Sequence, residues 1–242
     1  QTFLRSIMEK DLTVLLLLLY YNRPKLVRNM LQSIKESTYK NWKVALIDDG
    51  SDFPAEPIVR EMFTEEELAK VTFYSIPDTK ADKQARGGSI IGEKMNEAMD
   101  TLGCDLVILA CDDDAVHPDY LGNLNTYFKT NPEIHYAYSH IIPFNPYEQD
   151  WKTVEPTPSW LNKTHTLDPF CQVDASQVCW RTYCCAPGKA RFPVPKTANL
   201  DADIYGRVCE EFGLCPYTGF YGQFKAIFPN QLGNHSSYDK VD

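Results

Sequence analysis

The first half of the chain alternates between short apolar runs and segments with helical spacing. Uninterrupted apolar runs of this length are typical of strands buried on both faces of a parallel sheet. The segments between them place apolar residues three or four positions apart, as on one face of a helix. This alternation predicts an α/β fold with a mostly parallel sheet and helices on both faces. The predicted strands are residues 13–19, 42–47, 71–76 and 105–110, and the predicted helices begin at Pro24 or cover 57–70 and 89–102.

The second half of the chain is less regular. Proline-containing stretches interrupt it, and long loops inside a compact domain are often functional. The 242 residues suffice for one large domain, so we expect a single domain over 1–242 with a mixed C-terminal region. We predict helices over 118–129 and 200–212, strands over 134–142, 170–181 and 217–228, loops over 143–168 and 186–198, and a polar tail over 230–242.

Composition narrows the range of partners and compartments. The net charge of −9 argues against binding to nucleic acid or to an anionic membrane surface. The longest apolar run, residues 12–21, is too short to span a bilayer, and no signal-peptide pattern is visible. The cysteines lack zinc-ligand spacing, which favours a reducing, cytoplasmic compartment. Because the sequence begins at Gln1, it is compatible with a domain cut from a longer chain.

Three adjacent aspartates, Asp112, Asp113 and Asp114, follow the fourth predicted strand. Their carboxylates repel one another, and a hard cation such as Mg²⁺ or Mn²⁺ relieves that repulsion by taking oxygen ligands. Polar residues also follow the first and second strands, so three polar loops should meet at one edge of the sheet. The alternative is a solvated acidic turn before a helix opened by Pro118. The glycine motifs of a dinucleotide site and of a P-loop are absent from the sequence.

Three stretches of the chain form an ordered set of motifs. Residues 13–52 combine an apolar strand, a Tyr-Asn-Arg-Pro turn, a helix and an Asp-Asp-Gly-Ser-x-Asp loop. Residues 87–121 contain a helix, a strand and the aspartate-rich motif, and residues 200–208 read Leu-Asp-Ala-Asp-Ile-Tyr-Gly-Arg-Val. In order and spacing this set resembles glycosyltransferase family 2.

The resemblance implies a GT-A fold with a nucleotide-binding half at about 12–118 and an acceptor and catalytic half at about 119–242. It also implies a nucleotide-sugar donor, Mn²⁺ or Mg²⁺ as cofactor, and inversion at the anomeric carbon. The acceptor is expected to be a hydroxyl group, as on a glycan.

Several residues are expected to hold the donor nucleotide, some by this resemblance and some by their position before a helix. Tyr21 and Arg23 match the loop that holds the base, although Tyr21 is also explained as the last core residue of a strand. Asp49 matches the position that accepts a hydrogen bond from the base; a carboxylate suits the N–H of uracil or guanine, and UDP is favoured. Lys83 and Arg86 are candidates for the diphosphate, with solvated surface cations as the alternative.

The metal motif departs from the usual Asp-x-Asp-Asp form of the family. Counted back from the proline, Cys111 replaces the first aspartate, and Asp113 takes the metal-ligand position. Asp112 is then expected near the ribose, with Asp114 as a second metal ligand. In a plain Asp-x-Asp register, Asp112 and Asp114 would instead form the pair. His235 resembles a C-terminal histidine that closes on the metal or diphosphate in some GT-A enzymes.

Asp201 aligns with the general base of the family, which takes the proton from the attacking acceptor hydroxyl. Its alternative role is to cap the helix that begins there. The acceptor site is not readable from the sequence. Trp151, Trp160 and Trp180 are candidates because aromatic faces stack on sugar rings, but each equally suits a core position.

Three other functions are alternatives to glycosyl transfer. A sugar-nucleotide pyrophosphorylase would need a glycine-rich N-terminal loop, which the Tyr-Asn-Arg-Pro turn does not supply. A processive synthase would need membrane spans and a Gln-x-x-Arg-Trp motif, whereas the nearest string, 177–181, reverses the last pair. An inactive nucleotide-sugar-binding module is suggested by Cys111, while Asp201 argues against it.

Overall fold

The computed structural model describes residues 10–156, 174–195 and 200–227. These ranges contain one eight-stranded sheet in the order β3-β2-β1-β4-β7-β6-β8-β5. The predicted strands at 170–181 and 217–228 are therefore described only in part, and the tail at 230–242 lies outside the described residues.

The first four strands form the parallel part of the sheet, as predicted. β1 pairs with β2 and β4, and β2 pairs with β3, all in parallel. The centre is apolar throughout: residues 14–18 of β1 are fully buried, which the uninterrupted leucine run requires. The bounds are β1 (Val14–Tyr20), β2 (Trp42–Asp48), β3 (Val71–Ser75) and β4 (Leu106–Cys111).

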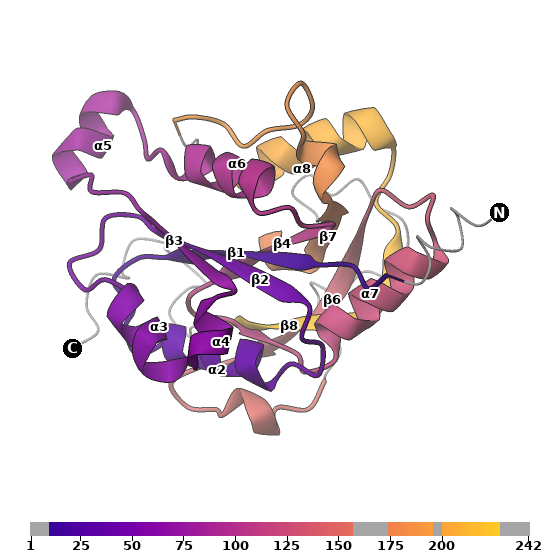
Figure 1. Cartoon of the computed structure of the whole chain (residues 1–242), viewed down its shortest axis with the longest axis horizontal. Helices are drawn as coiled ribbons and strands as arrows, with labels where there is room; N and C mark the ends of the chain where they lie inside the picture. The colour runs from indigo at the N-terminus through magenta and orange to yellow at the C-terminus, as the bar shows by residue number, and fades with distance from the viewer. Residues whose placement is uncertain (1–9, 157–173, 196–199, 228–242) are drawn as a thin grey trace.

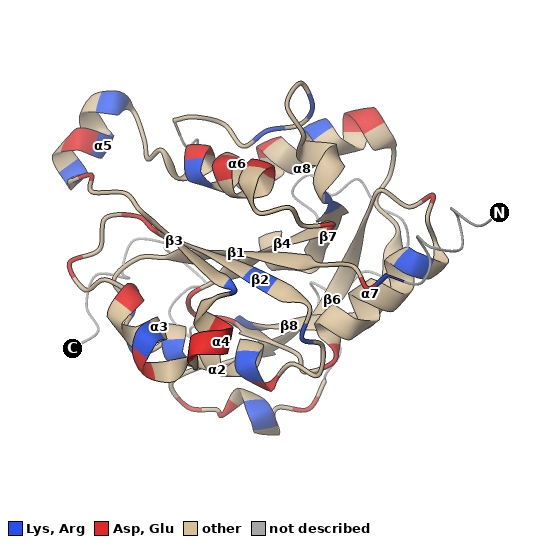
Figure 2. Ribbon diagram, in the orientation of Figure 1, with Lys and Arg blue, Asp and Glu red and all other residues tan. Residues whose placement is uncertain are grey.

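Helices cover both faces of this sheet (Figure 1). One face packs against α6 (Ile91–Thr101) and α8 (Leu200–Phe212), whose apolar side chains share a core cluster with β1 and β4. The opposite face packs against α2 (Val27–Glu36), α3 (Glu56–Met62), α4 (Glu65–Leu68) and α7 (Tyr120–Thr130). Charged side chains lie mainly on the helices and loops, and most strand ribbon is uncharged (Figure 2).

The second half of the chain completes the sheet with mixed pairing. β7 (Val178–Arg181) is antiparallel to β4 and to β6 (Tyr136–Phe144), and β6 is parallel to β8 (Tyr217–Ala226). A two-residue strand, β5 (Ala115–Val116), follows the aspartates directly and pairs antiparallel with β8. β5 was not predicted, because two residues carry no periodicity. It ties the aspartate motif to a strand a hundred residues later.

Two predicted helices differ from the observed ones. The predicted helix 57–70 is two helices, because Phe63 is extended and Thr64 begins α4 with a capping box to Glu67. The helix expected from Pro24 begins only at Val27. An additional helix, α5 (Lys80–Arg86), is capped by Thr79 and extends away from the sheet (Figure 1). Short 3₁₀ turns occupy Trp151–Thr153 (η1), Ala175–Gln177 (η2) and Thr182–Cys185 (η3).

The cysteines among the described residues are free thiols. Within the described ranges, none of the helices has the length and apolar character needed to cross a bilayer. For two of the tryptophans, the core position is the alternative that the structure supports. Trp151 and Trp180 are only 3% and 1% exposed and pack in the core, so neither presents a face to an acceptor sugar. Trp160 lies outside the described residues.

Candidate donor and metal site

The aspartate motif lies at the carboxyl ends of adjacent parallel strands, where the loops after β1, β2 and β4 meet. One contact between the loops after β1 and β4 is a hydrogen bond. The backbone N–H of Tyr21 donates to Asp112 Oδ2 at 2.9 Å. Asp112 is 3% exposed, and burial raises the pKa of its carboxyl while Arg23 opposes that shift. Asp112 therefore fixes the Tyr-Asn-Arg-Pro turn over the end of β4.

Arg23 contacts two aspartates at once. Its Nη1 lies 2.8 Å from Asp112 Oδ1 and 2.9 Å from Asp113 Oδ2. One guanidinium thus offsets the charge of two neighbouring carboxylates. In this structure Arg23 is directed toward the aspartates rather than toward the cavity beyond Tyr21.

Asp114 is completely buried and faces a different cation. Its Oδ2 accepts a hydrogen bond from Lys225 Nζ at 3.1 Å, and its Oδ1 accepts one from the backbone N–H of Ala226 at 2.9 Å. Burial alone would lower the pKa of the Lys225 ammonium, but the surrounding acidic groups, with Asp114 the strongest, together hold it well above its usual value. The Asp174 carboxylate also approaches Lys225, at 3.6 Å. Burial raises the pKa of the Asp114 carboxyl, and the charge of Lys225 opposes that shift. The hydrogen bonds from Lys225 and Ala226 hold Asp114 in one orientation.

A group of possible metal ligands lies at the end of β4. One donor atom each from Cys111, Asp113 and Asp114 lies within 4.8 Å of the others. Carboxylate oxygens fit Mg²⁺ or Mn²⁺. Burial raises the pKa of the Cys111 thiol well above its usual value, so it is protonated and a poor ligand. The donor set therefore fits a hard divalent cation held chiefly by oxygen.

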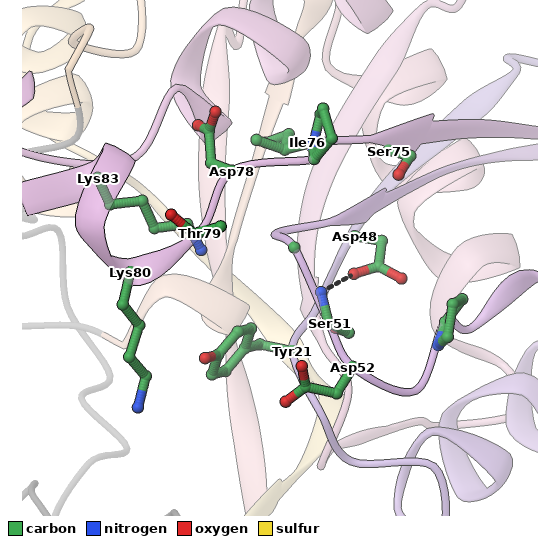
Figure 3. A pocket seen from close by; sticks show the side chains of 13 residues that line it. Tyr21, Asp48, Ser51, Asp52, Ser75, Ile76, Asp78, Thr79, Lys80 and Lys83 are labelled. Atoms are coloured by element: carbon green, nitrogen blue, oxygen red, sulfur yellow. Dashed lines mark hydrogen bonds between the residues drawn. The ribbon is translucent and has the colours of Figure 1, made fainter.

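A cavity of about 400 Å³ adjoins these loops (Figure 3). Its walls come from the ends of β1, β2 and β3 and from the start of α5. Lys83 Nζ lies 5.0 Å from the centroid of the Tyr21 ring, a cation–π distance. Lys80 also lines the cavity, although the sequence analysis did not select it. The lining residues are Tyr21, Asp48, Gly50, Ser51, Asp52, Pro54, Ser75, Ile76, Pro77, Asp78, Thr79, Lys80 and Lys83.

The two aspartates after β2 have different surroundings. Asp48 lines the cavity and accepts backbone hydrogen bonds from Ser51, at 2.9 Å, and Ala55, at 3.3 Å, so it shapes the loop. Asp49 instead accepts a hydrogen bond from the Ser89 hydroxyl, and its carboxylate lies 3.2 Å from Lys83 Nζ. The side chain expected to meet the base is thus held by Lys83 in this structure.

Arg86 lies apart from the cavity lining. Its guanidinium pairs with the Asp78 carboxylate, and its Nε donates to the Gly88 carbonyl at 3.3 Å. Of the two cations proposed for the diphosphate, Lys83 therefore lies at the cavity. Arg86 instead contacts Asp78 and Gly88, on either side of α5. His235 lies outside the described residues.

Asp201 lies in the first turn of α8, which begins at Leu200, and so inside the helix rather than at its cap. One turn later Tyr205 is buried, and its hydroxyl donates to the Ala175 carbonyl at 2.7 Å. Burial, with the charges of Asp201 and Asp174, raises the Tyr205 pKa well above its usual value. Tyr205 thus links the first turn of α8 to the segment that faces Lys225.

Gln223 and Lys225 are two further residues beside the aspartate motif that the sequence analysis missed. Gln223 is fully buried, and its Nε2 donates to the carbonyls of Leu109, at 2.8 Å, and Ser176, at 2.9 Å. Both residues alternate with apolar neighbours along β8, which was the available signal that they share one face of a strand. Their partners, however, are distant in sequence: Lys225 contacts Asp114 of the aspartate motif, and Gln223 contacts Leu109 and Ser176.

The sequence of this chain was compared with those of known protein families and curated proteins. The sequence matches the family model described as Glycosyl transferase family 2 over residues 16–185, which is more than half of the chain. The chain belongs to glycosyl transferase family 2. Among curated proteins, Protein CgeD of Bacillus subtilis (strain 168) is 23% identical over 126 residues, which cover 52% of this chain and 28% of that protein.

Solved structures of glycosyltransferases share the fold of this family 2 chain. S. aureus TarS 1-349 in complex with UDP-GlcNAc superposes with a TM-score of 0.68 at 13% identity, over 95% of this chain and 62% of that one. The mannosyltransferase PcManGT from Pyrobaculum calidifontis, in complex with GDP-Man and Mn²⁺, gives 0.62 at 14% identity, over 93% and 59%. These likenesses confirm the predicted GT-A fold. The chain spans less than two thirds of the length of these proteins.

Proposed function

We propose that this chain is an inverting, metal-dependent glycosyltransferase that moves a sugar from a nucleoside-diphosphate sugar to an acceptor hydroxyl. The observation that carries the proposal is the cavity at the ends of β1, β2 and β3, next to the buried aspartates at the end of β4. A nucleotide in the cavity would direct its diphosphate toward those aspartates. Family membership favours this function over a pyrophosphorylase.

The donor half of the reaction depends on residues of the first three loops. Tyr21 offers a ring to the base, and Lys80 and Lys83 offer positive charge within a chain of net charge −9. UDP is the favoured nucleotide, and GDP is the next candidate. The support is that TarS is seen with UDP-GlcNAc and PcManGT with GDP-Man.

The residues that would hold the metal are Asp113 and, beside it, Asp114. When bound, Mn²⁺ or Mg²⁺ supplies positive charge that stabilises the departing nucleoside diphosphate. Lys225 keeps Asp114 fixed in one orientation. Asp112 contributes by holding the turn that carries Tyr21, and in this proposal it lies near the ribose.

The acceptor half of the reaction is assigned to Asp201. Its carboxylate would take the proton from the acceptor hydroxyl while that oxygen forms the new bond to the anomeric carbon. The bond from that carbon to the diphosphate oxygen breaks with its electron pair in the same step, which inverts the configuration. A hydroxyl of a glycan is the proposed acceptor, and the cytoplasm is the proposed location.

Thermal unfolding with ligands tests the donor site. UDP, GDP, dTDP and CMP are each added with Mn²⁺, Mg²⁺ or EDTA. A ligand at 100 times its Kd stabilises the fold by about 2.7 kcal/mol, which is easily measured. We expect one nucleoside diphosphate to raise the melting temperature, with Mn²⁺ or Mg²⁺ but not with EDTA. No shift with any nucleotide would contradict the proposed donor site, whereas a shift without sugar transfer would support an inactive binding module.

A further inference from the structure

The Arg23 guanidinium lies between two carboxylates, and one of them, Asp113, belongs to the group of possible metal ligands. A single nitrogen, Nη1, is within 3 Å of an oxygen of Asp112 and of an oxygen of Asp113. Arginine keeps its charge at any physiological pH. The repulsion between these two neighbouring aspartates is therefore offset by a cation that belongs to the chain itself.

Arg23 is better placed to leave than the second internal cation, Lys225. Lys225 lies within β8 and faces Asp114, which is completely buried and also receives a backbone N–H from the same strand. Arg23 lies in the turn between β1 and α2, and its side chain is 22% exposed. Asp112 would stay in place without Arg23, because the Tyr21 N–H holds its other oxygen.

We infer that Arg23 is an exchangeable internal counter-cation, which a divalent metal must displace from Asp113 in order to bind there. The inference rests on the metal role of Asp113 in the proposed function. Two cations held by the same carboxylate repel each other, so the guanidinium lowers the affinity of the protein for free metal. A metal–nucleotide complex would carry phosphates that offer the displaced guanidinium a new bidentate partner.

The consequence is that Arg23 disfavours metal binding in the absence of the donor. Removing a residue that merely supports the fold would weaken metal binding or leave it unchanged. Removing a competing cation strengthens it. The direction of the change therefore separates the two roles.

Titration of the whole chain with Mn²⁺ alone, followed by the electron paramagnetic resonance signal of free Mn²⁺, tests the inference. We expect Arg23→Ala and Arg23→Gln to bind Mn²⁺ about tenfold or more tightly than the natural chain, a change equivalent to about 1.4 kcal/mol. Arg28→Ala is the matched control. It removes the same charge from α2, the helix that follows the turn. There the Arg28 guanidinium pairs with the Glu61 carboxylate at 2.6 Å and not with the aspartates.

Binding of Mn²⁺ by the Arg23 variants but not by the natural chain would also support the inference. Affinities equal to or weaker than that of Arg28→Ala, or no binding by any variant, would overturn it. Arg23→Gln keeps a hydrogen-bonding side chain, so it serves if Arg23→Ala does not fold. These results are separate from the nucleotide test, because failure of the proposed function would appear as no nucleotide-dependent stabilisation, whatever the Mn²⁺ affinities.

Discussion

At the scale of single residues, the three aspartates are distinguished by their partners rather than by their order. Asp112 accepts a hydrogen bond from the Tyr21 backbone and shares Arg23 with Asp113, whereas Asp114 faces Lys225. Consecutive residues of one motif thus have a positioning role, a cation in a surface turn and a cation within a strand. The three aspartates are adjacent in the chain, so their different roles arise from contacts with residues that are distant in sequence.

The Asp114–Lys225 pair should be a major contributor to stability. Lys225→Met keeps most of the side-chain length but leaves the buried carboxylate of Asp114 without its cation. We expect a loss of about 3–5 kcal/mol in the free energy of unfolding, measured by urea denaturation. Adding Asp114→Asn to this variant should recover part of the loss, because the unpaired charge is then gone. If the double variant is no more stable than Lys225→Met, the pair does not act as described.

Asp201 is predicted to act in catalysis and not in folding. Asp201→Asn keeps the shape of the side chain but cannot take a proton, so transfer should fall by roughly a hundredfold or more. Nucleotide-dependent stabilisation should remain. Asp203→Asn, two positions along α8, is the control and should keep most of the activity. Near-natural transfer by Asp201→Asn would exclude Asp201 as the base.

At the scale of elements, the cavity depends on how closely the loop after β2 approaches the segment before α5. Gly50 has a φ of 77°, and a Cβ there would lie 2.5 Å from the carbonyl oxygen of Asp78. Only glycine permits both this backbone conformation and this approach. The two segments therefore form facing walls of one cavity.

Gly50→Ala should consequently weaken nucleotide binding as well as lower the stability of the fold, because it displaces a wall of the cavity. We expect a loss of about 1–2 kcal/mol from the left-handed backbone and a further cost from the displaced wall. The matched control is Gly87→Ala, since Gly87 has a φ of 84° but no atom within 4 Å of its Cβ position. The measurement is the nucleotide-induced shift in melting temperature. Equal shifts in the two variants would contradict this account of the wall.

At the scale of the whole molecule, the family-matched region and the folded unit differ in extent. The match ends at residue 185, but β8 pairs with both β6 and β5, and α8 contributes Ile204, Tyr205 and Val208 to a core cluster. The site also draws Lys225 from beyond the matched region. α8 and β8 are therefore part of the folded unit, and β8 contributes Lys225 to the site.

Truncation tests this dependence. A chain of residues 1–185 should lose cooperative unfolding, because Tyr138, Ile142 and β5 would lack their β8 neighbours. A chain of residues 1–227 retains all the described strands and should keep a single cooperative transition. Circular dichroism during thermal unfolding distinguishes the two. A cooperative transition in 1–185 would show that β8 and α8 are dispensable.

The sequence by itself determined the parallel half of the sheet and the edge at which the site forms. Apolar runs buried on both faces, separated by helical spacing, admit few other arrangements, and the ends of parallel strands must meet at one edge. The aspartate motif was placed at this edge in this way, whereas Tyr21 and Asp49 were selected by their resemblance to family positions. The short β5 and the divided helix at 56–68 were not, because capping and pairing outweigh periodicity over so few residues.

Only the tertiary structure decided which charges face one another. Arg23, Asp114 and Lys225 are separated by ninety to two hundred positions, and no spacing rule links a turn after β1 with a residue of β8. Trp151 and Trp180 show the same limit, since aromatic residues look alike in sequence whether they pack in a core or face a ligand. Pairing across the sheet depends on strand order and register, which are set by the packing of the entire chain.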